Sequence, residues 1–94
     1  MKKTEKGALP GHGGTPRMLD RLAARGILEP MLGGIRDERL RTILTLRHGN
    51  GLGWAAVGEE LKKEGLYYSE RQIYRLYAQA TLAFEKRWGA AHES

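Results

Sequence analysis

The sequence contains no cysteine, which excludes disulfide bonds, thiolate zinc sites and cysteine nucleophiles. No apolar run approaches the roughly 18 residues that a helix needs to cross a bilayer. The lysines near the N-terminus are not followed by the apolar core of a secretory signal. We therefore expect a cytoplasmic protein with no membrane partner, whose fold is stabilised by packing alone.

Constellations typical of metal sites and of catalysis are missing as well. Three histidines share no ligand spacing with one another or with acids: His12, His48 and His92. Two adjacent pairs of carboxylates lie on helix faces that we expect to be exposed, with no pocket suited to acid–base work: Asp37-Glu38 and Glu59-Glu60. We expect no enzyme, no metal and no cofactor. We interpret His48 as a helix-end cation or a phosphate contact.

Basic charge is what the sequence does have. Sixteen Lys and Arg against eleven Asp and Glu give the 94 residues a net charge of +5. A basic surface favours polyanionic partners, and nucleic acid is the first of these.

Apolar residues recur at three- and four-residue spacing, and there is no alternation typical of a strand. This pattern predicts an all-α fold, a small helical domain of about four helices over residues 15–88 with a C-terminal helix-turn-helix over 53–88. The helices are expected at about 16–25, 37–48, 54–64 and 69–88. Residues 1–14 should form a flexible basic arm and 89–94 a frayed tail. The apolar connection at 26–36 should pack on the core.

Capping signals and apolar stripes support these boundaries. The signals are Thr15 and Asp37 as N-caps, Gly65 as a helix stop, and Ser69 with Gln72 as a capping box. The inward stripe of the last helix contains Ile73, Leu76, Tyr77, Ala80 and Phe84. Trp54 shares a face with other apolar residues of its helix, so we interpret it as an anchor in the core.

A helix followed by a turn and a strongly capped second helix is the plan in which the second helix enters the major groove of DNA. At about 100° per residue, the outward face of the last helix contains Arg71, Tyr74, Arg75, Ala78 and Gln79. Arginine can bind guanine through two hydrogen bonds, and glutamine can do the same with adenine. The residues expected to contact double-stranded DNA are Ser69, Glu70, Arg71, Gln72, Tyr74, Arg75 and Gln79, with Arg47, Lys62 and Lys63 as further phosphate contacts.

A family resemblance rests on two segments, residues 43–57 (ILTLRHGNGLGWAAV) and 68–77 (YSERQIYRLY). They are similar to small phage and prophage regulators of the ArpU/RinA type, which themselves resemble region four of sigma factors. The resemblance covers about residues 36–88 and implies a phage or prophage transcriptional regulator acting in a bacterial host cell. Two features depart from the family pattern. Gly53 stands in place of a capping serine, and the stretch 62–68 is longer than the usual turn.

The longer turn leaves a second hypothesis open. It is compatible with DNA binding if Leu66 and one of Tyr67 or Tyr68 pin it to the core, but it could equally present a surface to a protein. The alternative is a phage-derived protein that binds and inhibits a host protein, such as RNA polymerase or a CRISPR nuclease (an anti-CRISPR). A regulator of this size would form a homodimer through its N-terminal helix or the end around Phe84 and Trp88.

Overall fold

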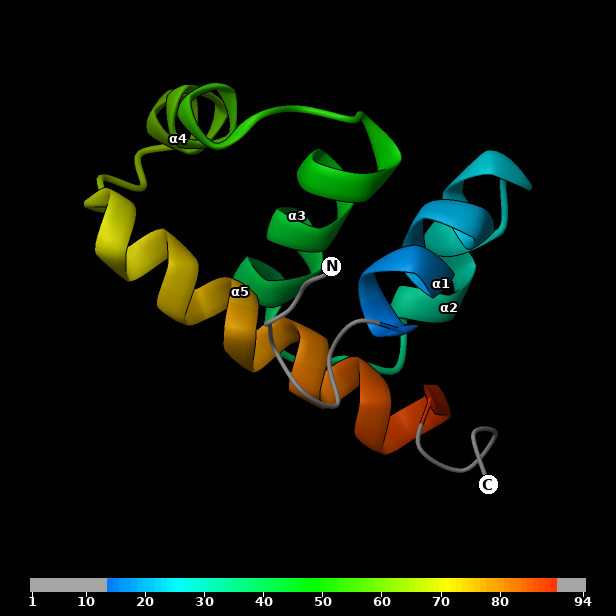
Figure 1. The fold of residues 1–94 in the computed structure, drawn as a ribbon. Helices are drawn as coiled ribbons and strands as arrows, with labels where there is room; N and C mark the ends of the chain where they lie inside the picture. The colour runs from blue at the N-terminus through cyan, green and yellow to red at the C-terminus, as the bar shows by residue number, and fades with distance from the viewer. Residues whose placement is uncertain (1–13, 90–94) are drawn as a thin grey trace, which may run out of the picture.

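A computed structural model describes residues 14–89, which form five α-helices and contain no strand (Figure 1). The prediction of a small all-α fold is confirmed, and no described helix is long and apolar enough to cross a lipid bilayer. The helices are α1 (Gly14–Ala24), α2 (Leu28–Leu32), α3 (Glu38–Leu44), α4 (Trp54–Lys63) and α5 (Glu70–Phe84). Single π-helical turns follow two of them, η1 (Thr45–Gly49) after α3 and η2 (Glu85–Gly89) after α5. The predicted arm and tail lie almost entirely outside the described residues.

Two of the predicted N-caps are present. The Asp37 carboxylate accepts a hydrogen bond from the backbone N–H of Arg39 at 2.9 Å and opens α3. Ser69 opens α5 through the predicted capping box with Gln72. Thr15, in contrast, does not cap α1. It lies inside the first turn, and its hydroxyl donates to the Glu85 carboxylate at 2.6 Å, so it connects α1 to the far end of the chain.

The segment predicted as a connection at 26–36 contains the short helix α2, so the helices number five rather than about four. Pro30 is tolerated there because the first turn of a helix needs no backbone N–H donor. Leu28, Leu32 and Ile35 are buried, which confirms that this segment packs on the core. Ile27 was expected to be covered as well, but it follows the turn at Gly26 and stays 40% exposed.

The turn after α4 ends the helix as predicted. Gly65 has a φ of +82°, and its N–H donates to the Lys62 carbonyl while the N–H of Leu66 donates to the Leu61 carbonyl. These two bonds form a Schellman motif, which needs the left-handed conformation that glycine adopts at little cost. Leu66 then packs against the core, and this fixes the direction in which the chain leaves α4.

The core lies where α3 crosses α5. Figure 1 shows α4 over the start of α5, α3 over its middle, and α1 with α2 beside α3 on the other side. The buried apolar side chains come from every helix: Leu19, Leu28, Leu32, Ile35, Leu40, Ile43, Leu44, Leu46, Val57, Leu61, Ile73, Leu76, Ala80 and Phe84. Leu46 belongs to η1 and is buried with them.

The end around Phe84 and Trp88, where we expected contacts of a homodimer, packs within the chain, and the homodimer stays a prediction. Phe84 is fully buried, and Trp88 packs against the core. The Trp88 indole N–H donates to the carbonyl of Met31 at 3.1 Å, so η2 is pinned to α2. The rings of Phe84 and Trp88 therefore pack against other residues of the same chain.

Candidate nucleic-acid interface

The outward face of α5 is exposed as the helical periodicity predicted. Arg71, Tyr74, Arg75, Ala78 and Gln79 are all exposed. On the opposite face, the residues that hold α5 against the rest of the protein are Ile73, Leu76, Ala80 and Phe84. The packing therefore leaves one side of a 15-residue helix in solvent, with cationic and amide side chains along it.

Arg71 and Arg75 stand one turn apart on this face. Neither forms an ion pair or a hydrogen bond with another side chain in residues 14–89. Two like charges at positions i and i+4 repel each other slightly, and an anion between them would relieve that repulsion. The pair is thus a candidate contact for phosphate or for the acceptor edge of guanine.

Glu70 and Tyr74 form the flank of the face next to α4. The Tyr74 hydroxyl donates to the Glu70 carboxylate at 3.0 Å, and this hydrogen bond raises the pKa of Tyr74. Glu70 lies in the first turn of α5, where a carboxylate interacts favourably with the helix dipole. An acceptor at this position disfavours phosphate and favours an amino group, such as N4 of cytosine.

The capping box uses two of the predicted contacts. The Ser69 hydroxyl accepts from the N–H of Gln72 at 3.1 Å, and Gln72 Oε1 accepts from the N–H of Ser69 at 2.8 Å. Gln72 cannot present both its oxygen and its amide group to one adenine while this box holds. Among residues 14–89 its NH₂ group has no acceptor, and the Gln79 amide has no side-chain partner at either end.

Arg47 is held inside the protein more firmly than a surface phosphate contact would be. Its Nη1 donates to the Leu52 carbonyl at 2.8 Å, and its guanidinium carbon lies 4.5 Å from the centre of the Trp54 ring. Trp54 in turn meets Tyr74 and Tyr77 edge to face. Trp54 packs partly buried against the core, as predicted. The position of Arg47 within the apolar stripe of its helix was the one signal of this arrangement in the sequence.

Lys62 and Lys63 lie at the end of α4 and are more than half exposed. Their ammonium groups lie 3.4 and 3.0 Å from the carboxylates of Glu59 and Glu60. Exposed pairs of this kind contribute about 0–1 kcal/mol, so an incoming phosphate can displace them. The end of α4 is therefore close to neutral overall rather than strongly basic.

His48 was expected to be a helix-end cation or a phosphate contact; it lies in the last turn of η1, as the first of these requires, but it is not on the surface where a phosphate could reach it. Its side chain is only 6% exposed, because η1 turns it inward between α1 and α5. Nδ1 lies 2.7 Å from the Asp20 carboxylate and Nε2 lies 2.7 Å from the Tyr77 hydroxyl. Burial raises the pKa of Tyr77.

The connection between α4 and α5 is fixed on one side and open on the other. Leu66 and Tyr68 pack against the core, so the prediction that one of the two tyrosines pins the turn is confirmed. The other, Tyr67, is 75% exposed. Tyr68 also lies beside Arg39, a residue for which no role was expected because it is far from α5 along the chain.

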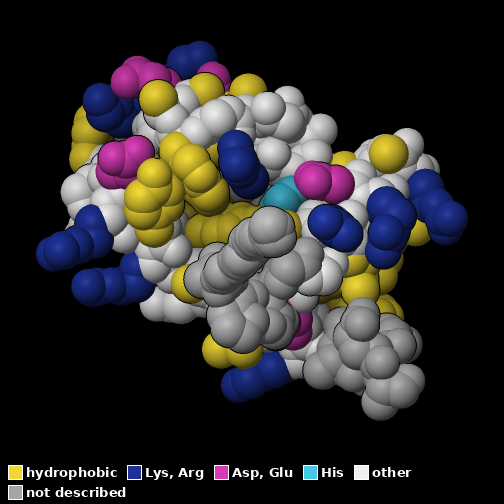
Figure 2. Space-filling view, viewed as in Figure 1, with side chains coloured by type: hydrophobic (Ala, Val, Ile, Leu, Met, Phe, Trp, Pro, Cys, Tyr) yellow, Lys and Arg dark blue, Asp and Glu magenta, His cyan; other side chains and the backbone are white. Residues whose placement is uncertain are grey.

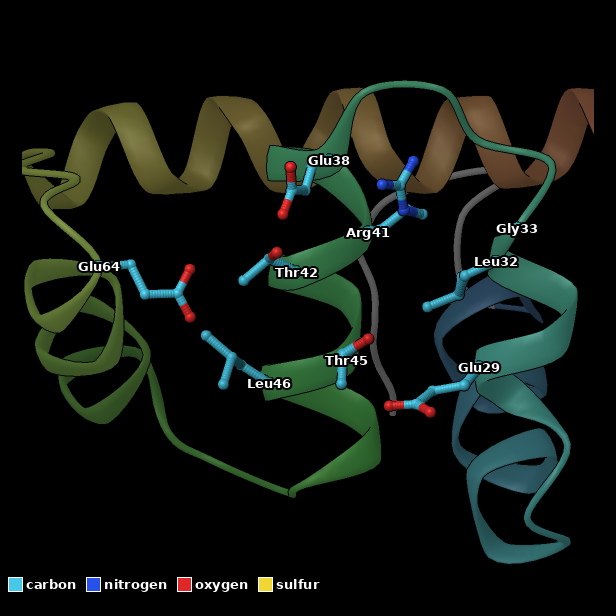
Figure 3. A pocket seen from close by; sticks show the side chains of 9 residues that line it. All are labelled: Glu29, Leu32, Gly33, Glu38, Arg41, Thr42, Thr45, Leu46 and Glu64. Atoms are coloured by element: carbon cyan, nitrogen blue, oxygen red, sulfur yellow. The ribbon is translucent and has the colours of Figure 1, made fainter.

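One hollow on the surface has the wrong charge for nucleic acid. It has a volume of about 440 Å³ and opens between α2, α3 and the end of α4 (Figure 3). Its charged lining consists of three carboxylates, from Glu29, Glu38 and Glu64, and one guanidinium group, from Arg41, so its net charge is negative. No residue of α5 contributes to it. Figure 2 shows that Lys and Arg side chains are spread over the visible face of the molecule and are not gathered into one patch.

The chain matches no protein-family model, no curated protein and no solved structure. DNA binding and the resemblance to phage regulators therefore stay predictions. The support for either has to come from the residues themselves.

Proposed function

We propose that this protein is a double-stranded DNA-binding module and that α5 enters the major groove. The observation that carries the proposal is the exposed face of α5, on which Arg71 and Arg75 have no partner among the described side chains. An α-helix with its side chains is about 10–12 Å across, and the major groove is about 12 Å wide. A single helix presenting two free guanidinium groups and one free amide fits that groove.

The packing supports a reading role for α5, because recognition requires a helix that does not move. The capping box holds its start, and four buried apolar side chains hold its inner face. α4 and α5 with the connection between them are proposed to act as a helix-turn-helix in which α4 lies across the DNA backbone. The resemblance of residues 36–88 to ArpU/RinA-type regulators agrees with this assignment and suggests phage or prophage transcription regulation.

Each side chain on the face has a chemical role in the proposal. Arg71 and Arg75 donate to guanine O6 and N7, and Gln79 donates to and accepts from adenine. Glu70, held by Tyr74, accepts from cytosine N4. Contacts of this kind carry sequence preference, whereas Lys62 and Lys63 at the end of α4 would add affinity without preference.

The proposal is tested by selecting bound sequences from a random duplex pool at two salt concentrations. We expect an enriched motif, and we expect Arg75→Ala to weaken binding to that motif by about five- to 150-fold, the effect of one bidentate contact. Arg25→Ala is the matched control, because Arg25 is also exposed but follows α1, which packs on α2 and η1. Absence of salt-sensitive binding to any duplex would falsify the proposal.

A second candidate function, binding of a host protein, has one observation in its favour. Tyr67 is 75% exposed at the tip of the connection, and Tyr74 nearby on α5 is 46% exposed. Tyrosine is enriched in protein–protein interfaces, where it provides both apolar area and a hydroxyl. This candidate predicts that Tyr67→Ala abolishes capture of the partner while Arg75→Ala leaves capture unchanged. The DNA-binding proposal predicts instead that Arg75→Ala weakens binding to the duplex and that Tyr67→Ala leaves this binding unchanged.

A further inference from the structure

A small notch lies between α3 and α5, next to the exposed face of α5. Its volume is about 170 Å³, and three elements line it. α3 contributes Arg39, the connection contributes Tyr68, and α5 contributes the rest: Gln72, Arg75, Leu76 and Gln79. We call this feature the Arg39–Arg75 notch. It exists only because α3 packs across α5, since Arg39 and Arg75 are far apart in the sequence.

The polar lining of the notch consists of groups that can donate hydrogen bonds. Two guanidinium groups, two amides and one phenol line the notch together with one apolar residue, Leu76, which is 7% exposed. No carboxylate is among the lining residues. The capping box fixes the orientation of Gln72, because its Oε1 accepts from Ser69 and its NH₂ group is the end left to donate. A lining with many donors and no carboxylate is suited to bind an anion. Asp37 pairs with Arg39 from outside the lining and offsets one of the two guanidinium charges.

Arg39 is held in place before any ligand arrives. Its Nε and Nη2 donate to the two oxygens of Asp37 at 3.2 and 2.8 Å, and Asp37 itself caps α3. The remaining N–H groups of the guanidinium are left for another acceptor. The bonds with Asp37, and after them the contact with Tyr68, raise the pKa of Arg39, so it stays charged. Asp37 lies outside the lining of the notch.

We infer that the Arg39–Arg75 notch binds a phosphate group through Arg39, Arg75 and the hydroxyl of Tyr68, and that in a DNA complex this group belongs to the backbone. The source of the phosphate rests on the proposed function, because only a DNA-binding α5 would bring a backbone phosphate to this place. A guanidinium group matches the spacing of phosphate oxygens and can donate to two of them.

The position of the notch beside α5 agrees with binding of a DNA backbone phosphate. A helix that fills the major groove has a sugar–phosphate strand on each side, so side chains beside the inserted face meet phosphates rather than bases. Arg75 lies between the two environments, since it belongs to the exposed face of α5 and also lines the notch. Arg39 lies on α3, beside this face, and we expect it to contact the sugar–phosphate backbone of the DNA and no base.

The first test compares Arg39→Gln with Arg25→Gln. Each substitution removes the charge of one exposed arginine, and only Arg39 lines the notch. Binding of each variant to the selected duplex is measured over a range of salt concentrations. We expect Arg39→Gln to lower the slope of log K against log salt by about 1, as the loss of one phosphate contact does, and to leave the preferred sequence unchanged. Arg25→Gln should leave the slope as it is. Equal slopes for the two variants would overturn the assignment of a backbone phosphate to the notch, while DNA binding stands.

Tyr68→Phe provides a second variant that keeps the ring packed against the core. It removes one neutral donor, so we expect the affinity to fall about two- to ten-fold while the salt slope stays unchanged. This variant also decides the matter if Arg39→Gln disturbs the start of α3, which circular dichroism would show. An unchanged affinity for Tyr68→Phe contradicts the role assigned to its hydroxyl.

A third measurement separates the notch from the proposed function. Inorganic phosphate is titrated into the protein at constant ionic strength, and the side-chain NH₂ signals of Gln72 and Gln79 are followed by NMR. Saturable shifts that disappear in Arg39→Gln establish a phosphate site even if no duplex binds, in which case DNA binding fails and the notch survives with free phosphate as its ligand. The absence of both the shifts and the change in slope shows that the inference is wrong.

Discussion

The guanidinium group of Arg47 lies 4.5 Å from the centre of the Trp54 ring and donates to the Leu52 carbonyl, so one side chain joins η1 to the start of α4. This contact sets the position of α4 relative to α5, because Trp54 also touches Tyr74 and Tyr77 of α5. A cation over an aromatic ring contributes about 0.5–2 kcal/mol, depending on how much water is excluded.

We expect Arg47→Ala to lower the free energy of unfolding by about 1–2 kcal/mol, because it removes both the stacking contact and the hydrogen bond to Leu52. Urea denaturation followed by circular dichroism measures the change. Arg36→Ala is the matched control: Arg36 is exposed, and its removal should alter stability by less than about 0.5 kcal/mol. Equal effects of the two substitutions would show that the Arg47 contact contributes nothing.

Arg71→Lys tests whether Arg71 recognises a base or only supplies charge. Lysine retains the charge but cannot form the paired hydrogen bonds of a planar guanidinium. We expect the salt dependence of DNA binding to be unchanged and the discrimination at one base pair to fall by about 1–3 kcal/mol. Competition between the selected duplex and single-base variants measures this. If lysine preserves the full discrimination, Arg71 acts through its charge alone.

Trp88→Phe removes the hydrogen bond from the indole to the Met31 carbonyl and keeps most of the ring. We expect a loss of about 1 kcal/mol in stability, because the carbonyl of Met31 loses its donor. Tyr67→Phe is the control at an exposed aromatic position and should have almost no effect. DNA affinity should not change in either variant, since neither residue lies on the exposed face of α5. A loss of binding in Trp88→Phe would contradict the placement of the interface.

Asp37→Asn isolates one pH-dependent contribution to stability. The hydrogen bonds from Arg39 lower the pKa of Asp37 below its usual 3.8, so the stabilisation is complete above about that pH and is lost as the pH falls through the lower, folded-state value. Asparagine still caps the helix but carries no charge. We expect a shallower loss of stability in Asp37→Asn as the pH falls below about 4, by less than about 1 kcal/mol because the pair is exposed. Thermal unfolding at several pH values measures it, and identical profiles would exclude the effect.

The sequence was sufficient for the features that depend on neighbouring residues. The all-α class, the capping box at Ser69 and the stop at Gly65 follow from local backbone hydrogen bonds, which act over three to five positions. The exposed set on α5 follows from the helical period in the same way. These predictions agree with the structure because short-range geometry determines them. The helix α2 was missed since Gly26, Pro30 and Gly33-Gly34 resemble the signals of a loop.

Only the tertiary structure decided which polar side chains are free. Arg47 and His48 appeared to be spare cations in the sequence, yet one is held over Trp54 and the other between Asp20 and Tyr77. Arg39 received no role from the sequence, yet it lines a notch together with Arg75. The physical reason is that a charge is satisfied by whatever packing brings within about 3–4 Å, and such partners lie tens of residues away along the chain. Local sequence determined the helices and the faces they expose, and the crossing of α3 over α5 determined what those faces can bind.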